Sequence, residues 1–102
     1  MTKEEILDIL KERLGEAIYI LIVLKEGPLL KEQIKERANE YYKSKGNSDA
    51  DLIPSRHILD IYTARLEGAG LVNVSEIGRA RVYERSQLAE VLINHIKIRP
   101  IK

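Results

Sequence analysis

Apolar residues recur at helical spacing in the N-terminal quarter of the chain. Four of them share one face of residues 1–14: Ile6, Leu7, Leu10 and Leu14. This spacing predicts an amphipathic helix that begins at Thr2, with Glu5 at the distance of a capping box. After Gly15, residues 16–27 are apolar on nearly every side, so we expect a second helix in the middle of the core.

Two further helices are predicted on either side of a polar segment. Leu30, Ile34 and Ala38 repeat at helical spacing in the third helix, which we expect to end at Gly46. The stretch "NSDADLI", residues 47–53, is predicted to be a polar loop. Residues 54–55, Pro and Ser, suit the start of the fourth helix, because proline favours the first positions of a helix.

The hydrophobic period changes from helical to alternating after Gly70. Residues 71–75 and 80–85 are β-rich and flank Gly78, which predicts a two-stranded hairpin with a tight turn. From Ser86 the helical spacing returns, and it ends before Pro100. We therefore expect an α+β fold that is mainly α-helical and carries one small β-hairpin.

The order of these elements is typical of a winged helix-turn-helix with extra N- and C-terminal helices. In that fold the second helix of the motif, the recognition helix, lies in the DNA major groove, and the hairpin, called the wing, reaches the flanking backbone. The prediction is one domain over residues 1–102. It comprises an N-terminal helix at 1–14, a winged helix-turn-helix core at 15–85 and a C-terminal helix at 86–98.

Composition excludes several function classes. With 44% hydrophobic and 32% charged residues and a net charge of +1, the chain has the balance of one small soluble domain. It has no cysteine, no apolar run of transmembrane length and no secretory leader pattern, so a cytoplasmic, nucleoid-associated protein is expected. The preference for Ile, Lys and Glu is typical of thermophiles. The two histidines lack metal-ligand spacing, so we expect no metal, no cofactor and no enzymatic activity.

Three segments resemble winged-helix regulators of the PadR type: "ILIVLKEGPLLKEQIKERANEYY", "HILDIYTARLEGAGLV" and "RARVYERS". The best-marked element is the Leu-Glu-x-x-Gly-Leu-Val motif at residues 66–72, and the resemblance covers about residues 17–96. It implies a regulator that binds double-stranded DNA, most often as a dimer. No binding site for a small-molecule effector is identifiable from the sequence.

Candidate DNA contacts lie on the predicted recognition helix and wing. Six residues of the helix are polar or charged on its outer side or near its boundary: Ser55, Arg56, His57, Asp60, Thr63 and Arg65. Because the N-terminal residues of such helices read base edges, we expect readout by Arg56 and His57 and a phosphate contact by Ser55. Asp60 could orient Arg56 or accept from a cytosine amino group.

The remaining candidate contacts come from the wing and from the third helix. Arg79, Arg81 and Arg85 follow the Gly78 turn, where they either contact the DNA backbone or protect an edge strand by charge. Lys31 and Lys35 could contact backbone, and they equally suit a solvated helix face.

The two terminal helices carry more apolar residues than a solvated helix needs. A homodimer interface is predicted at five of them: Ile6, Leu10, Leu88, Leu92 and Ile96. A two-fold interface would place two recognition helices about 34 Å apart on a palindromic site. The alternative is that both helices cover the core of one chain.

The sequence therefore predicts a homodimeric, sequence-specific DNA-binding protein that regulates transcription, as a repressor that blocks its site. Two alternatives stay open. One is a plasmid or chromosome partition protein, or an architectural protein that coats DNA. The other is a winged helix used for protein–protein contact.

Overall fold

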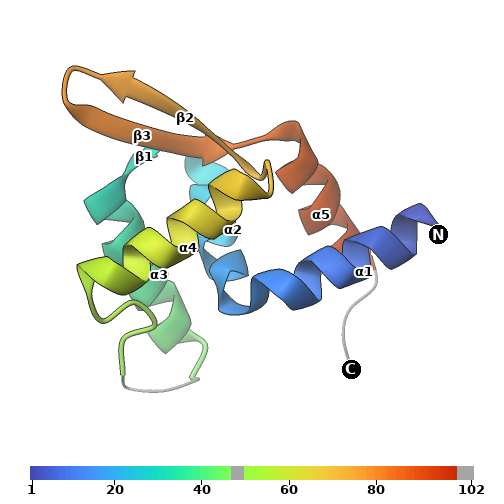
Figure 1. Cartoon of the computed structure of the whole chain (residues 1–102). Coiled ribbons are helices and arrows are strands. Elements are labelled where there is room, and N and C mark those ends of the chain that lie inside the picture. Colours follow the sequence, from blue (N-terminus) through green and yellow to red (C-terminus); the bar gives the residue numbers. More distant parts are fainter. Residues whose placement is uncertain (47–49, 99–102) are drawn as a thin grey trace.

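The chain folds into five α-helices and one small antiparallel sheet among the residues described by its computed structural model, 1–46 and 50–98 (Figure 1). Helix α1, Lys3–Leu14, begins at Thr2. The Thr2 hydroxyl accepts from the Glu5 N–H at 3.1 Å, and the Glu5 carboxylate accepts from the Thr2 N–H at 3.0 Å. The predicted capping box is thus confirmed.

The central helix α2, Ile18–Val23, is short and continues as single turns of 3₁₀ helix at Gly15–Ala17 and Leu24–Glu26. Ile20 and Leu21 are fully buried, as the apolar sequence of this segment predicts. Each such side chain contributes about 1.5–3 kcal/mol by leaving water.

The segment after Pro28 differs from the prediction. Leu29–Leu30 forms a short strand, β1, and helix α3, Lys31–Ser44, begins only after it. Leu29 pairs with Tyr83 and Leu30 with Val82. Because this partner strand lies more than 50 residues further on, the local spacing that suggested a helix at Leu30 does not reveal the pairing.

A buried asparagine fixes the connection between α3 and α4. Asn39 donates through Nδ2 to the Ile53 carbonyl at 3.1 Å, and its Oδ1 accepts from the Ile53 N–H at 2.7 Å. Leu52 and Ile53 are buried, so the predicted polar loop ends in two core residues, while its residues 47–49 lie outside the described residues. Buried backbone groups need partners, and Asn39 satisfies both of those of Ile53.

Helix α4, Arg56–Gly68, follows this connection and packs one face on the core. Leu59 and Leu66 are fully buried, and the Ser55 hydroxyl accepts from the Ile58 N–H at 3.3 Å at the start of the helix. The predicted bounds of this helix are confirmed within a residue or two.

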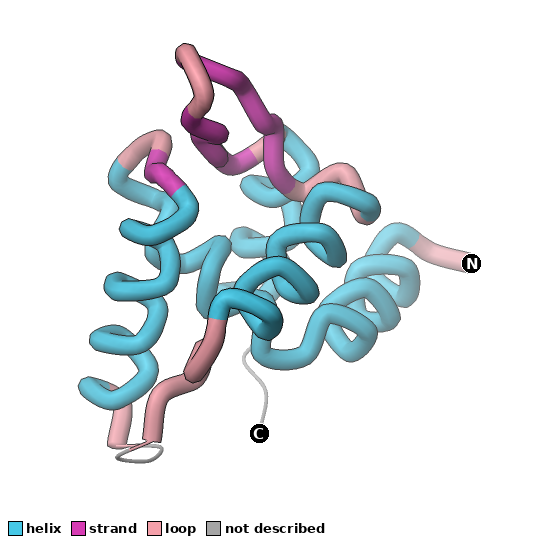
Figure 2. The backbone as a smooth tube through the Cα atoms, turned by 60° about the vertical axis from the view of Figure 1, so that its left-hand side comes forward, coloured by secondary structure: helices cyan, strands magenta, loops and turns pink. Residues whose placement is uncertain are grey.

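The wing belongs to a three-stranded sheet with the order β1-β3-β2, one strand more than predicted. Strands β2, Val72–Ile77, and β3, Ala80–Arg85, pair antiparallel and project beyond the helices (Figures 1 and 2). Ile77 pairs with Ala80, which leaves a two-residue turn whose first residue, Gly78, has φ 64°. Glycine suits this turn because it adopts positive φ without steric cost.

Helix α5, Gln87–Ile98, returns along the helices and completes the core. Ser86 joins it to the wing, because its hydroxyl donates to the Gly70 carbonyl at 2.7 Å and accepts from the Ala89 N–H at 3.2 Å. The predicted end before Pro100 lies outside the described residues. The predicted α+β winged-helix fold is confirmed.

Candidate nucleic-acid interface

The outer face of α4 presents polar and cationic side chains to solvent. Arg56, His57 and Arg65 are exposed, and the Arg65 guanidinium lies over the Tyr62 ring at 5.8 Å. Among the described residues neither His57 nor Arg65 makes an ion pair. The N-terminus of a helix also carries partial positive charge, so the start of α4 favours anionic or acceptor groups.

Four charged side chains join the first turn of α3 to the first two turns of α4, and we name them the Asp60 network: Lys31, Glu32, Arg56 and Asp60. Asp60 Oδ1 lies 2.5 Å from Lys31 Nζ and 3.3 Å from Arg56 Nε. Arg56 Nη1 lies 3.2 Å from Glu32 Oε1. The Asp60 network therefore places two predicted contact residues, Arg56 and Lys31, beside carboxylates.

Thr63 is not an external contact, so its prediction as a DNA-binding residue is wrong. Its side chain is buried, with 2% of the residue exposed, and its hydroxyl donates to the Leu59 carbonyl at 2.9 Å. A hydroxyl that bonds the preceding helical turn and lies in the core has no free group to offer a ligand.

Of the two arginines nearest the wing turn, one is free and one is held by an ion pair. Arg79 is exposed in the turn and makes no ion pair within the described residues. Arg81 Nη2 lies 3.2 Å from both carboxylate oxygens of Glu67 at the end of α4, and its guanidinium lies 5.7 Å from the Tyr83 ring centre. Arg81 thus fixes the wing against α4, a role that its sequence position does not reveal.

Arg85 points inward, which contradicts its prediction as a DNA contact. Its Nε donates to the Leu21 carbonyl at 2.7 Å, its Nη1 lies 3.3 Å from Glu90, and only 12% of its side chain is exposed. These contacts connect β3 with α2 and α5. A guanidinium held in this way stabilises the domain and is not available to DNA.

The predicted backbone contact Lys35 is half-buried on α3, without an ion pair to any described residue. Lys31 has 18% of its side chain exposed and belongs to the Asp60 network. Of these two, Lys35 therefore retains a free ammonium group for a backbone contact.

The predicted interface residues of the two terminal helices differ in how far they are buried. Ile6 is 51% and Leu88 40% exposed, whereas Leu10 and Ile96 are partly buried. Leu92 is fully buried within its own chain, so its prediction as an interface residue is wrong. Ile9, which the sequence analysis did not single out, is 43% exposed.

A contact between His95 and Asp8 joins α5 to α1. His95 Nε2 lies 2.7 Å from Asp8 Oδ1, and the imidazole is largely buried. The contact places His95 at the junction of the two terminal helices.

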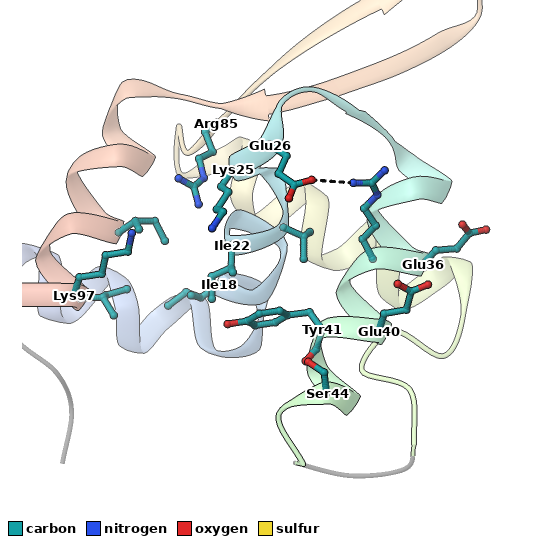
Figure 3. Close-up of a pocket in the computed structure, with 14 residues that line it drawn as sticks. Ile18, Ile22, Lys25, Glu26, Glu36, Glu40, Tyr41, Ser44, Arg85 and Lys97 are labelled. Atoms are coloured by element: carbon teal, nitrogen blue, oxygen red, sulfur yellow. Dashed lines mark hydrogen bonds and ion pairs between the residues drawn. The ribbon is translucent and has the colours of Figure 1, made fainter.

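A groove of about 1000 Å³ opens between α2, α3 and α5, on the far side of α2 from α4 (Figures 1 and 3). Its floor is apolar, with Ile18 and Ile22 from α2, and Lys25 and Lys97 reach its rim. The Glu26 carboxylate, next to Lys25 in the chain, pairs with Arg37 of α3 at 3.5 Å. This groove was not predicted from the sequence, because its walls come from three separated segments.

Among residues 1–46 and 50–98 no helix is long and apolar enough to cross a membrane. The same residues contain no cluster of three His, Asp or Glu side chains arranged to hold a metal ion.

Comparison with known proteins places this architecture in a family. No protein-family model matches the chain, so the narrower PadR-type resemblance gains no support. The chain is 42% identical to the DNA-binding protein TubR of Bacillus cereus (strain ATCC 10987 / NRS 248) over 106 aligned residues. The alignment covers 97% of this chain and 89% of the relative. Identity at this level over nearly the whole of both proteins shows common descent, and the chain belongs to the family of the DNA-binding protein TubR.

Proposed function

We propose that the chain binds double-stranded DNA at specific sites, with α4 as the recognition helix and the β2–β3 hairpin as the wing. The observation that carries the proposal is the 42% identity to a DNA-binding protein over 97% of the chain. The fold supports it, because a helix with a capped, polar N-terminus lies beside a projecting hairpin, as in winged-helix readers of the major groove.

In this proposal the exposed groups of α4 and of the wing have different tasks. Arg56 and His57 occupy the first turn of α4, where base edges are read, and the Ser55 hydroxyl lies at its cap. Arg79 stands in the wing turn and suits a phosphate contact. Arginine is well suited to both tasks because its planar group donates several hydrogen bonds at once.

Site-specific binding fits the charge of this face better than uniform coating of DNA does. Lys31, Arg56 and Arg81 are each paired with a carboxylate, which leaves few cations free for phosphate. Coating without sequence preference depends on many phosphate contacts. We accordingly favour a homodimer that binds specific sites, as a repressor or as a partition protein, over a protein that coats DNA without sequence preference.

A gel shift with genomic fragments and a random duplex at 50 and 200 mM salt tests the proposal. We expect one retarded complex on a subset of fragments and weak binding to the random duplex. A ladder of complexes with equal affinity for every fragment would instead indicate coating. A folded protein that binds no duplex would refute DNA binding and favour the protein–protein alternative.

A further inference from the structure

The Asp60 network cancels its own charge at the edge of the candidate recognition helix. Two cations, Lys31 and Arg56, face two carboxylates, Glu32 and Asp60, at 2.5 to 3.3 Å. Neither cation is therefore a free positive charge in the absence of DNA. A phosphate that approaches them also approaches the two carboxylates, which repel it.

Arg56 nevertheless keeps donors available for a neutral partner. A guanidinium has five N–H groups, and the Asp60 network uses one on Nε and one on Nη1. Three N–H groups remain, and 64% of the side chain is exposed. A guanine edge needs two of them for its O6 and N7 atoms and carries no net charge for the carboxylates to repel.

We propose that Asp60 is a positioning residue for sequence discrimination. It holds Arg56 through Nε for a base edge, and together with Glu32 it cancels the attraction of Arg56 and Lys31 for phosphate. DNA without the matching base is then bound only weakly by these cations, whereas DNA with the matching base is held by a bidentate hydrogen bond from Arg56. This inference rests on the proposed function and identifies which side chains make that binding selective.

The ionisation of Asp60 agrees with this role. The hydrogen bond from Lys31 is the main reason that the pKa of the Asp60 carboxyl lies below its ordinary value. Desolvation opposes this by less than the Lys31 bond, and a hydrogen bond from Arg56 lowers the pKa further. The carboxylate is therefore charged at every pH at which DNA binding is measured.

The test compares three variants that each remove one negative charge: Asp60→Asn, Glu32→Gln and the control Glu36→Gln. Glu36 is exposed on α3, lines the groove away from α4 and makes no ion pair with any described residue. Affinities for a selected site and for a random duplex are measured across 50 to 200 mM salt. Circular dichroism melts verify that each variant is folded.

We expect Asp60→Asn to raise the affinity for the random duplex at 50 mM salt by roughly 3- to 10-fold and to steepen the salt slope by about one. The ratio of site to random affinity falls accordingly. Glu32→Gln should also raise the affinity for the random duplex and lower the ratio of site to random affinity. Glu36→Gln should change the affinities for the site and for the random duplex by the same factor, so that their ratio stays that of the wild type.

If the wild type is selective and Asp60→Asn has the same ratio of site to random affinity and the same salt slope as Glu36→Gln, the role of Asp60 is overturned and the proposed function stays intact. A wild type that binds no duplex would refute the proposed function and this inference with it.

Discussion

Replacement of Asn39 by alanine tests how the fold holds the start of the recognition helix. The substitution removes both hydrogen bonds to Ile53, a residue with no exposed surface. The Ile53 N–H and carbonyl then lose their partners inside the protein. An unsatisfied buried polar group costs about 1–3 kcal/mol, so we expect a loss of roughly 2–5 kcal/mol in the free energy of unfolding. That is a large part of the about 5–15 kcal/mol that stabilises a typical domain.

Urea denaturation followed by circular dichroism measures this loss at one fixed protein concentration. The matched control is Asn94→Ala, which removes the same side chain from an exposed position in helix α5. The control should change stability by no more than about 0.5 kcal/mol. An Asn39→Ala protein as stable as the control would refute the role of Asn39 in fixing the connection to α4.

The remaining predictions concern binding, acid stability and assembly. Arg56→Ala should reduce discrimination at one base position by about 1–3 kcal/mol, whereas Arg79→Ala should weaken binding to all duplexes alike and lower the salt slope by about one; titrations with variant sites measure both. Because its folded pKa is lowered, Asp60 stabilises the protein above the ordinary carboxyl pKa of about 3.9, and this contribution is lost as pH falls through the lowered value. The stability difference between wild type and Asp60→Asn should therefore be constant near neutral pH and shrink in acid, and an unchanged difference down to pH ~2 would contradict it. In sedimentation the wild type should have twice the chain mass of 11.7 kDa, and Ile6→Asp should have the mass of one chain; a wild type of 11.7 kDa at every concentration would exclude the dimer.

Local spacing predicted the helices well because their signals lie within a few residues of each other. The capping box at Thr2, the start of α4 at Ser55 and the turn at Gly78 were all found in this way. The strand at Leu29–Leu30 was missed because it exists only through its pairing with β3. The contact of Asn39 with Ile53 escaped prediction for the same reason, since no local pattern marks a bond between distant residues.

The sequence predicted where the candidate site lies better than it predicted which residues are free to contact DNA. The exposed location of Arg56 and Arg79 follows from the helix face and the turn, which the sequence encodes locally. Arg85 and Thr63 looked similar in sequence, but the Leu21 carbonyl of α2 holds Arg85 from 64 residues away, and the face of α4 that carries Thr63 packs into the core. Such long-range contacts and burial depend on how the elements pack, and a local sequence pattern does not show them.

A footprint of the full chain on genomic DNA, repeated with Arg56→Ala, tests the central claim most directly. We expect wild type to protect discrete sites with two similar half-sites, and the variant to lose preference at one position of each half-site. Uniform protection of all DNA, no protection by folded protein, or the same base preference in wild type and variant would contradict the assignment of α4 as the helix that selects the site.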